Sequence, residues 1–262
     1  MIKQEGSVLP GKLFDLSGKT AIVTGGNGGI GLGIGLGLAS AGANLIIAGR
    51  DASKNRAALA QVESKGGNAI AITCDVTRQV DIDHCVSQAR DQYGSVDILV
   101  NNAGVASGGV PELLEEVIWD QVLDVNLKSV LRFSQACHPH MKSIGGGKII
   151  NIGSMYSIFG SPFGAPYSAS KGGVVQLTKS LAVAWARDNI QVNVILPGWI
   201  TTDMTAPAID NKAFYDSIIA RTPTGRFGEP EEMAGAAVFL ASHAADFVTG
   251  ISLPVDGGYS IT

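Results

Sequence analysis

Cysteine, charged residues and aromatic residues are all scarce in this chain of 262 residues. It contains three cysteines, 16% charged residues and 6% aromatic residues. Cys74, Cys85 and Cys137 are widely spaced and form no C-x-x-C pair, which argues against a disulfide framework and a zinc site. Hydrophobic residues make up 45%, so the low charge does not indicate disorder. Free thiols fit a reducing compartment, and we expect a cytoplasmic protein.

A basic surplus and a membrane-spanning run are also missing. Lys and Arg number 19 against 23 for Asp and Glu, whereas nucleic-acid binding needs a basic face. The first twenty residues contain no apolar core of a secretory signal. The stretch from Thr20 to Gly49 has no charge, but glycines, Asn27, Ser40 and Asn44 interrupt it, so it does not predict a spanning helix. We expect neither a nucleic acid nor a membrane as partner.

What is present is a regular alternation of short β-branched runs with helical segments. We predict strands at 19–24, 44–48, 69–73, 96–100, 148–153, 190–196 and 251–255, and helices ending near 41, at 52–64, 79–92, about 112–142 and 166–187. Alternation of this kind predicts a parallel sheet covered by helices on both faces. No linker divides the chain. We therefore predict an α/β fold with a single doubly wound Rossmann-type domain over 16–262, after an N-terminal extension at 1–15.

A glycine-rich turn, TGGNGGIG at 24–31, follows the first predicted strand. Glycine permits a tight turn and lets the backbone approach a pyrophosphate, which the next helix N-terminus would attract. We expect Gly25, Gly29 and Gly31 to serve a dinucleotide. Gly33 and Gly37 are four residues apart, and we expect them only to pack the helix tightly on the sheet.

Tyr167 and Lys171 stand at positions i and i+4 of a predicted helix, so both lie on one face. An ammonium group near a phenol favours the phenolate and lowers the tyrosine pKa toward the range of a general base. Ser154 follows the strand at 148–153. Since the carboxyl ends of parallel strands share one edge with the helix N-termini, Ser154, Tyr167 and the glycine turn should meet at that edge.

Taken together, these motifs resemble the short-chain dehydrogenase/reductase family. The resemblance runs from about residue 17 to the end of the chain. The matching segments are TGGNGGIG at 24–31, CDV at 74–76, NNAG at 101–104, DVNL around Asn126, NIGS ending at Ser154, YSASK at 167–171, LPGWITTDM at 196–204 and PVDGG at 254–258. It implies an oxidoreductase that transfers a hydride between a nicotinamide cofactor and a secondary alcohol or ketone.

The resemblance also implies residue roles. Tyr167 would be the acid/base, Lys171 would hold the nicotinamide ribose, Ser154 would bind the substrate oxygen, and Asn126 would hold a relay water. The implied cofactor contacts are Gly25, Asn27, Gly29, Ile30, Gly31, Arg50, Asp75, Val76, Asn101, Ala103, Gly104, Tyr167, Lys171, Pro197, Gly198, Ile200 and Thr202. Of these, Asn101 would mainly tie neighbouring strands together.

The end of the second predicted strand bears on the choice of cofactor. Gly49 stands where NAD-preferring relatives carry an aspartate, and Arg50 offers paired donors to a 2′-phosphate. We therefore favour NADP(H). NAD(H) stays open, because Gly28 lacks the basic side chain of many NADP-preferring relatives and Asp51 either neutralises Arg50 or caps the next helix.

Several alternatives are open at this point. The substrate could be a sugar, a sugar acid, or a cyclic or 3-oxoacyl type ketone. A non-catalytic nucleotide-sensing regulator is the alternative function, and a lyase or isomerase with the same cofactor is a third. Residues that could line an apolar pocket or belong to the core are Met155, Phe159, Phe163, Trp199 and Met204.

Other residues have simpler expected roles. His138 and His140 have no acidic or cysteine partner at a ligand spacing, so we predict no metal. We expect Asp203 and Asp256 to be structural.

Two expectations concern regions outside the catalytic motifs. The segment from about 203 to 222 contains Pro207 and an Asp210-Asn211 pair, and we expect it to be a mobile substrate lid. We also expect a homotetramer, because the helices predicted at 112–142 and 166–187 carry apolar outer positions beyond what one sheet face can cover. These positions are Val174, Val175, Leu177, Leu181, Val183 and Trp185.

Overall fold

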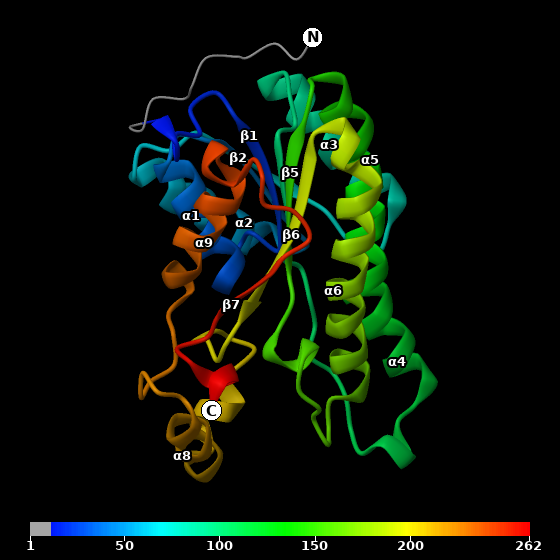
Figure 1. Cartoon of the computed structure of the whole chain (residues 1–262), viewed down its shortest axis with the longest axis vertical. Helices are drawn as coiled ribbons and strands as arrows, with labels where there is room; N and C mark the ends of the chain where they lie inside the picture. The colour runs from blue at the N-terminus through cyan, green and yellow to red at the C-terminus, as the bar shows by residue number, and fades with distance from the viewer. Residues whose placement is uncertain (1–11) are drawn as a thin grey trace.

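Seven parallel strands form one central sheet in the computed structural model, which describes residues 12–262 (Figure 1). Most of the predicted extension at 1–15 lies outside the described residues. The strands are β1 (Thr20–Thr24), β2 (Asn44–Gly49), β3 (Ala69–Thr73), β4 (Ile98–Asn101), β5 (Gly147–Ile152), β6 (Ile190–Pro197) and β7 (Ser252–Val255). Their order is β3-β2-β1-β4-β5-β6-β7. The chain reverses direction across the sheet between β1 and β4, where a doubly wound fold opens its ligand crevice.

Helices cover both faces of this sheet (Figure 1). One face packs against α1 (Gly29–Ser40), α2 (Ala52–Ser64) and α9 (Ala234–Ala241). The other packs against α3 (Gln79–Tyr93), α5 (Ser129–Ser143) and α6 (Ala165–Trp185), with α4 (Glu116–Leu123) beside α6. The five inner strands are mostly buried on both sides, which is why they read as continuous apolar runs, whereas the edge strands β3 and β7 are partly exposed.

The predicted helix at about 112–142 is not one regular α-helix. A short 3₁₀ turn precedes α4, and a π-helical turn at Asp124–Lys128 joins α4 to α5. The 3₁₀ segments of the structure are Pro111–Leu113, Met155–Ser157, Ala186–Asp188, Pro230–Met233, His243–Ala245 and Tyr259–Ile261. The other predicted elements agree with the structure to within about two residues.

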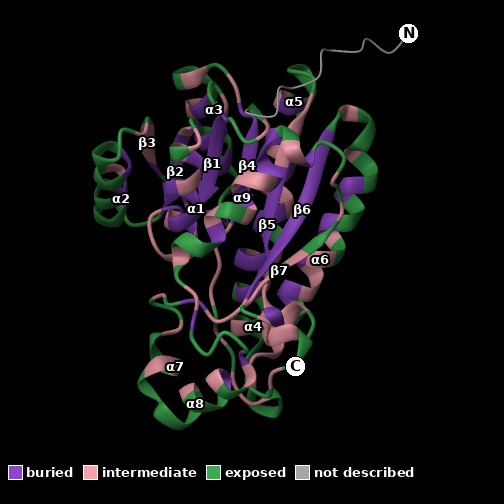
Figure 2. Cartoon of the chain, turned by 60° about the vertical axis from the view of Figure 1, so that its left-hand side comes forward, coloured by how far each residue is buried: buried purple, intermediate pink, exposed green. Residues whose placement is uncertain are grey.

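Two short helices extend beyond the carboxyl ends of the strands. They are α7 (Ala206–Asp210) and α8 (Lys212–Arg221), and they lie apart from the sheet at one end of the molecule (Figure 2). Ile218 is the one fully buried residue within these two helices. They therefore rest on few internal contacts and face the crevice above them.

Two sequence expectations about packing are wrong. Val174 and Leu181 are buried inside the chain and belong to its core, so they are not outer positions of α6. Val183, by contrast, is 83% exposed. Gly33 and Gly37 do not face the sheet either. A Cβ atom at these positions would meet Pro230 and Ala234, so the two glycines let α9 and the turn before it approach α1.

No helix within residues 12–262 is long and apolar enough to cross a membrane.

Candidate active site

A cleft of about 1220 Å³ opens along the carboxyl edge of the sheet. This volume exceeds the 300–1000 Å³ typical of a site for one small ligand. Its walls come from the glycine turn, the loops after β2 to β6, the start of α6, the segment at 197–214 and Tyr259. The cleft is therefore large enough for a cofactor and a second molecule together.

The glycine turn lies at one end of the cleft and needs its glycines for two different reasons. Gly25 and Gly29 have φ angles of +62° and +48°, in the left-handed region that side chains disfavour. Gly31 is buried, and a Cβ atom there would collide with the Gly25 carbonyl and the Asn102 amide. Gly31 thus supports the turn from behind and does not line the cleft, whereas Gly25 and Gly29 do.

Asn102 fixes the turn from the neighbouring strand β4. Its side-chain amide donates to the carbonyls of Thr24 and Gly25, at 3.0 and 3.1 Å. The Thr24 hydroxyl in return accepts from the backbone N–H groups of Asn102 and Ala103. We did not single out Asn102 from the sequence, although it stands inside the NNAG segment. The N-terminus of α1 behind this turn has no side-chain cap, which leaves its N–H groups free for an anion.

Asn27 and Asn55 occupy the space beside Gly49. The Asn27 amide donates to Asn55 Oδ1 at 2.7 Å, and the Asn55 amide donates to the carbonyls of Gly49 and Ile72. A Cβ atom at Gly49 would lie 2.6 Å from Asn55 Oδ1 and closer still to the Asn27 amide. The structure therefore has no room for a side chain at residue 49.

Arg50 and Lys54 are the two cations at this end of the cleft. The Asp51 carboxylate caps α2 by accepting hydrogen bonds from the N–H groups of Ser53 and Lys54 at 2.8 and 3.1 Å. Of the two roles that the sequence left open for Asp51, neutralising Arg50 or capping the helix, the structure shows the cap. Lys54 forms an ion pair of 2.9 Å with Asp203 across the cleft mouth. Asp203 is one of the residues that line the cleft. Asp256 has a different role, because its carboxylate accepts hydrogen bonds from the backbone N–H groups of Gly258 and Ser260 and so holds the C-terminal turn.

Asp75 lies deeper in the same end. Its carboxylate accepts from the N–H and hydroxyl groups of Thr77, at 2.9 and 2.7 Å. Partial burial opposes ionisation, but these two bonds and the charges of Arg50 and Arg78 lower the pKa of Asp75. The group is thus a carboxylate with a fixed orientation toward the cleft.

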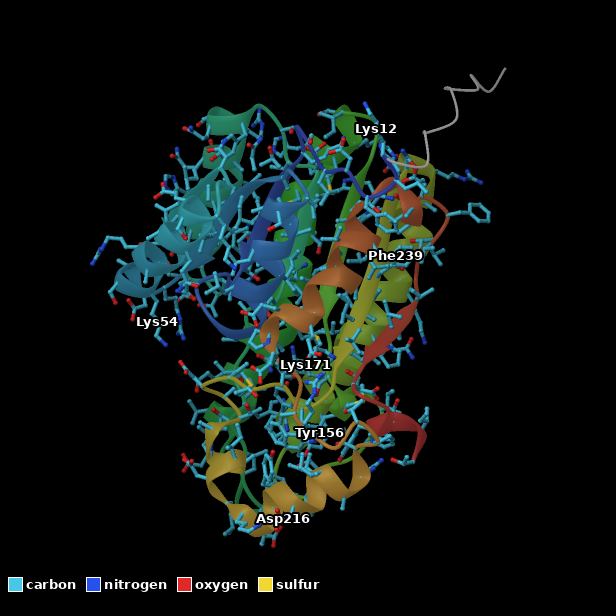
Figure 3. The ribbon with its side chains drawn as sticks, turned by 90° about the vertical axis from the view of Figure 1, so that its left-hand side faces the viewer. Lys12, Lys54, Tyr156, Lys171, Asp216 and Phe239 are labelled. Carbon is cyan, nitrogen blue, oxygen red and sulfur yellow. The ribbon has the colours of Figure 1, made fainter. Side chains whose placement is uncertain are left out.

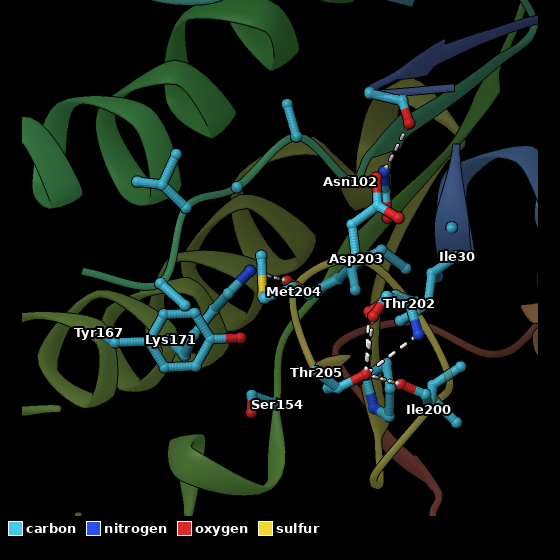
Figure 4. A pocket seen from close by; sticks show the side chains of 18 of the residues that line it. Ile30, Asn102, Ser154, Tyr167, Lys171, Ile200, Thr202, Asp203, Met204 and Thr205 are labelled. Atoms are coloured by element: carbon cyan, nitrogen blue, oxygen red, sulfur yellow. Dashed lines mark hydrogen bonds between the residues drawn. The ribbon is translucent and has the colours of Figure 1, made fainter. Parts of the chain in front are cut away.

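Ser154, Tyr167 and Lys171 converge at the middle of the cleft, as Figure 4 shows. Ser154 follows β5 and caps the 3₁₀ turn after it. Tyr167 and Lys171 lie on the first turns of α6, and the Lys171 ammonium is 5.7 Å from the centre of the Tyr167 ring. Lys171 donates to the Ile152 carbonyl at 2.7 Å. The sheet edge and the helix start bring the three groups together, as their spacing predicted.

Burial is the largest influence on the ionisation of Tyr167 and Lys171. It lowers the pKa of Lys171 to about 8. Burial also raises the pKa of Tyr167, while the Ser154 hydroxyl acts in the opposite direction. The expected lowering of the tyrosine pKa by Lys171 is not found, since desolvation by burial is the largest influence on Tyr167.

Asn126 is fully buried on the π-helical turn and does not line the cleft. Its Oδ1 accepts from the Val105 N–H at 2.8 Å, and its amide donates to the Val105 carbonyl at 2.9 Å and to Ser170 Oγ at 3.1 Å. Ser170 stands between Tyr167 and Lys171 on α6. Asn126 thus joins the strand edge after β4 to the helix that carries the tyrosine and the lysine.

The remaining candidate residues fall into two groups, those that line the cleft and those that support it from behind. Asn101 is buried and bonds Asn151 and Ser134, so it ties β4 to β5 and α5 as expected. The candidates that line the cleft are Gly25, Asn27, Gly29, Ile30, Arg50, Asp75, Val76, Ala103, Gly104, Ser154, Tyr167, Lys171, Pro197, Gly198, Ile200 and Thr202.

His138 pairs with Asp188 at 2.9 Å on the surface of the molecule. Within residues 12–262, no three histidine, cysteine or acidic side chains gather in a group that could hold a metal ion.

Comparison with known proteins matches most of the chain to dehydrogenases and reductases. A family model described as enoyl-(acyl carrier protein) reductase matches residues 25–260. The gluconate 5-dehydrogenase of Gluconobacter oxydans is 41% identical over 250 residues, covering 95% of this chain and 98% of that protein. The galactitol 2-dehydrogenase (L-tagatose-forming) of Cereibacter sphaeroides is 40% identical over 253 residues, with coverage of 95% and 98%.

A solved structure gives the same result in three dimensions. The gluconate 5-dehydrogenase of Burkholderia cenocepacia J2315, in complex with NADP and tartrate, is 39% identical to this chain. The match has a TM-score of 0.92 and covers 96% of this chain and 98% of that one. The likeness extends over the cleft as well as the sheet, because nearly the entire chain is aligned.

Proposed function

The chain belongs to the short-chain dehydrogenase/reductase family, and on that premise we propose that it is an NADP(H)-dependent ketone reductase and alcohol dehydrogenase that uses Tyr167 as acid and base. It is an oxidoreductase that transfers a hydride between a nicotinamide cofactor and a secondary alcohol or ketone. The observation that carries the assignment of Tyr167 is the convergence of Ser154, Tyr167 and Lys171 on a cleft that begins at the glycine turn.

The residues present fit a dinucleotide. The glycine turn leaves backbone N–H groups open, Gly25 and Gly29 keep side chains out of the way, and Arg50 and Lys54 supply positive charge. When bound, the nicotinamide gives or accepts the hydride. Around it we assign contacts to the candidate residues that line the cleft, and we assign supporting roles to Gly31 and Asn101, which lie behind it.

The proton chemistry belongs to the chain itself. In the reducing direction the Tyr167 hydroxyl donates its proton to the carbonyl oxygen of the substrate, and the Ser154 hydroxyl donates a hydrogen bond to the same oxygen. The Lys171 ammonium holds the ribose and stabilises the phenolate that remains. Asn126 keeps α6 in place through Ser170 and Val105, and this position suits the relay water that we assign to it.

The structure beside β2 supports NADP(H). No acceptor for a ribose 2′-hydroxyl stands at Gly49, because Asn27 and Asn55 fill that space. Arg50 follows, and its charge reaches Asp75 across the loop ends. A guanidinium group with paired donors matches a 2′-phosphate. The relative from Burkholderia cenocepacia with NADP in its cleft is consistent with this choice.

The test is kcat/KM with both cofactors for the wild type, Arg50→Ala and the control Arg56→Ala. Arg56 is exposed on α2 and does not line the cleft. We expect the wild type to prefer NADPH and Arg50→Ala to lose about tenfold or more with NADPH alone, since a charge-assisted pair is removed. A wild type that prefers NADH, or equal effects of the two substitutions, would contradict the cofactor proposal.

We propose that residues 203–222 form a lid that closes over the substrate. The lid holds α7 and α8, is largely exposed, and contacts the cofactor end through the exposed Asp203–Lys54 pair. Such a pair contributes little stability. In hydrogen exchange without ligands, amides of the lid should exchange far faster than those of β5. Equal protection of the two segments would refute the lid.

We propose that the protein is a cytoplasmic homotetramer. Large apolar side chains remain exposed on the surface in the single chain, among them Val117, Val183, Phe247 and Ile261. A closed symmetric assembly would bury such side chains. The expected mass in light scattering at micromolar concentration is four times 27.0 kDa, and a monomer would overturn the assembly. The proposed compartment rests on the cysteines. All three are free and buried, which suits a reducing cytoplasm.

A further inference from the structure

The part of the cleft beyond Ser154 and Tyr167 is walled mainly by rings and thioethers. It is formed by Met155, Tyr156 and Phe163 after β5, by Trp199, Met204 and Phe214 on the segment after β6, and by Tyr259 near the C-terminus. We call this part the substrate chamber. Figure 3 shows Tyr156 between Lys171 and the helix that carries Asp216, which is α8.

The rings of the substrate chamber form a connected series that begins at the reacting hydroxyl. Tyr156 contacts the Tyr167 ring edge-on with centroids 6.2 Å apart, and it meets Trp199 in the same way at 6.3 Å. Trp199 in turn meets Phe214 of the lid at 5.6 Å. Aromatic pairs favour such edge-on geometry, and their rings offer a large apolar surface. A substrate whose carbonyl reaches Tyr167 therefore lies beside Tyr156, the first ring of this series.

Three apolar side chains of the substrate chamber are unusually exposed in the chain itself. Phe163 is 63% exposed, Met204 is 47% exposed and Phe214 is 43% exposed. All three line the cleft. Exposed apolar groups that gather in a cleft with a few polar groups mark a site for an apolar ligand.

Positive charge is absent from the substrate chamber. Among the described residues that line the whole cleft, the cations are Arg50, Lys54 and Lys171. Arg50 and Lys54 follow β2, and Lys54 is already paired with Asp203 of the lid at 2.9 Å. Lys171 is buried against the Ile152 carbonyl, and the proposed function commits it to the ribose. None of the three is available to a substrate in the substrate chamber.

Arg221 lies nearby but is held by aromatic side chains. Its guanidinium group lies 4.5 Å from the centre of the Phe159 ring and 4.2 Å from that of Tyr259, and it donates to the Tyr259 hydroxyl at 3.3 Å. It does not line the cleft. The one charged lining residue of the lid is an anion, Asp203. The charge of Arg221 reaches the Tyr156 hydroxyl, but its guanidinium group is bonded to Tyr259. A carboxylate enclosed in the substrate chamber would thus have no lining cation to pair it, which is unfavourable.

We propose that the substrate is an uncharged ketone or secondary alcohol attached to an alicyclic or aromatic ring, and that sugar acids are poor substrates. The inference rests on the proposed function, because it takes Tyr167 as the point to which the carbonyl is bound. It separates this chain from its gluconate-oxidising relative. Ser107, Ser161 and Asn211 supply a few uncharged polar groups to orient the ring.

Two cyclohexanones that differ in charge provide the test. The probes are 4-oxocyclohexane-1-carboxylate and its methyl ester, with 5-keto-D-gluconate as a third ketone and NADPH as reductant. We expect kcat/KM for the ester to exceed that for the carboxylate by about 100-fold or more, because only the carboxylate leaves a buried charge unpaired. Equal values, or preference for the carboxylate or for 5-keto-D-gluconate, would overturn the proposal and leave the reductase assignment intact.

A lid substitution tests the cause of the preference. Met204→Arg adds a cation to the wall, and Met204→Gln is the matched uncharged control. We expect Met204→Arg alone to raise kcat/KM for the carboxylate by about tenfold or more while changing that for the ester less. The same gain in both variants, or no gain in either, would show that charge does not set the preference.

Failure of the reductase assignment remains distinguishable from failure of the substrate class. If no probe is reduced with either cofactor, the proposed function is wrong. Calorimetric titration of the protein with NADP⁺ and each cyclohexanone then decides the substrate class. Tighter binding of the ester supports the uncharged ring, and equal or tighter binding of the carboxylate overturns it.

Discussion

The two ends of the cleft are formed by different parts of the chain, backbone turns at one end and large side chains at the other. The cofactor end consists of backbone turns held by buried amides, such as Asn102 on the glycine turn and Asn55 beneath Gly49. The substrate chamber consists of large side chains, and two of them, Met204 and Phe214, belong to a lid with few buried residues. Hydrogen bonds fix position at the first end, and ring contacts adapt to shape at the second. The cofactor end is therefore suited to one fixed ligand, whereas the substrate chamber is the part in which side chains set the choice of substrate.

Tyr167 lies where the two ends meet, so its loss should have the largest effect. Tyr167→Phe removes the proton donor and very little volume, and we expect kcat to fall about 1000-fold. The dissociation constant for NADPH, measured by fluorescence titration, should stay within about twofold, because the cofactor end is untouched. A variant that keeps more than about a tenth of kcat, a barrier change under about 1.4 kcal/mol, contradicts the acid/base role.

Lys171 gives the cofactor end a distinctive pH dependence. Burial lowers its folded-state pKa from 10.5 to about 8. Between these values the unfolded chain binds more protons than the folded chain, so the contribution of Lys171 to stability rises with pH. The full effect is on the order of 3 kcal/mol.

The measurement compares the free energy of unfolding of the wild type with that of Lys171→Met. The free energy of unfolding of the wild type should rise relative to that of Lys171→Met between about pH 8 and pH 10. A difference that does not change with pH would show that burial does not shift this lysine.

A pair of alanine substitutions tests directly whether one end is rigid and the other loose. Asn102→Ala removes two bonds to turn carbonyls, and we expect a loss of about 1–3 kcal/mol with weaker cofactor binding. Met204→Ala on the exposed lid should change stability by less than about 0.5 kcal/mol. Thermal unfolding of both variants at one protein concentration measures the contrast. Similar shifts in Tm would remove the distinction between the two ends.

A substitution at Gly49 should have the smallest effect, and it tests the cofactor preference alone. Gly49→Asp adds the acceptor that NAD-preferring relatives carry, but its Cβ would press on Asn27 and Asn55. We expect it to weaken NADPH binding without improving kcat/KM for NADH by more than about threefold. Gly49→Asp with Asn27→Gly restores space and should improve NADH use further. If Gly49→Asp alone switched the cofactor preference from NADPH to NADH, the space filled by Asn27 and Asn55 would not determine which cofactor binds.

The strands and the site edge were predictable from the sequence because they depend on local patterns. β-branched runs between glycine turns fix β1 and β2, and the ends of parallel strands must share one edge. Ser154, Tyr167 and Lys171 therefore meet where their spacing placed them. The space beside Gly49 was not predictable, since two asparagines from different elements fill it.

Contacts between distant segments escaped prediction for the same physical reason. Gly33 and Gly37 serve α9, which follows them by about two hundred residues, and not the sheet. The Lys54–Asp203 pair joins residues 149 positions apart. Val174 and Leu181 are as apolar as the exposed Val183, and periodicity alone does not tell which side of a helix meets the sheet. Such features follow from tertiary packing, which no local pattern encodes.

The π-helical turn at Asp124–Lys128 has a consequence for how the chain can evolve. A π turn is one residue more than a regular helix needs, so it acts as an insertion retained in the middle of a continuous rod. Deleting one residue there would restore the regular ladder and turn Asn126 away from Val105 and Ser170. Such a chain would have a regular helix but would lose the three hydrogen bonds of the buried Asn126 side chain. The extra residue is therefore the structural reason why Asn126 points at α6, and it must be retained for that contact.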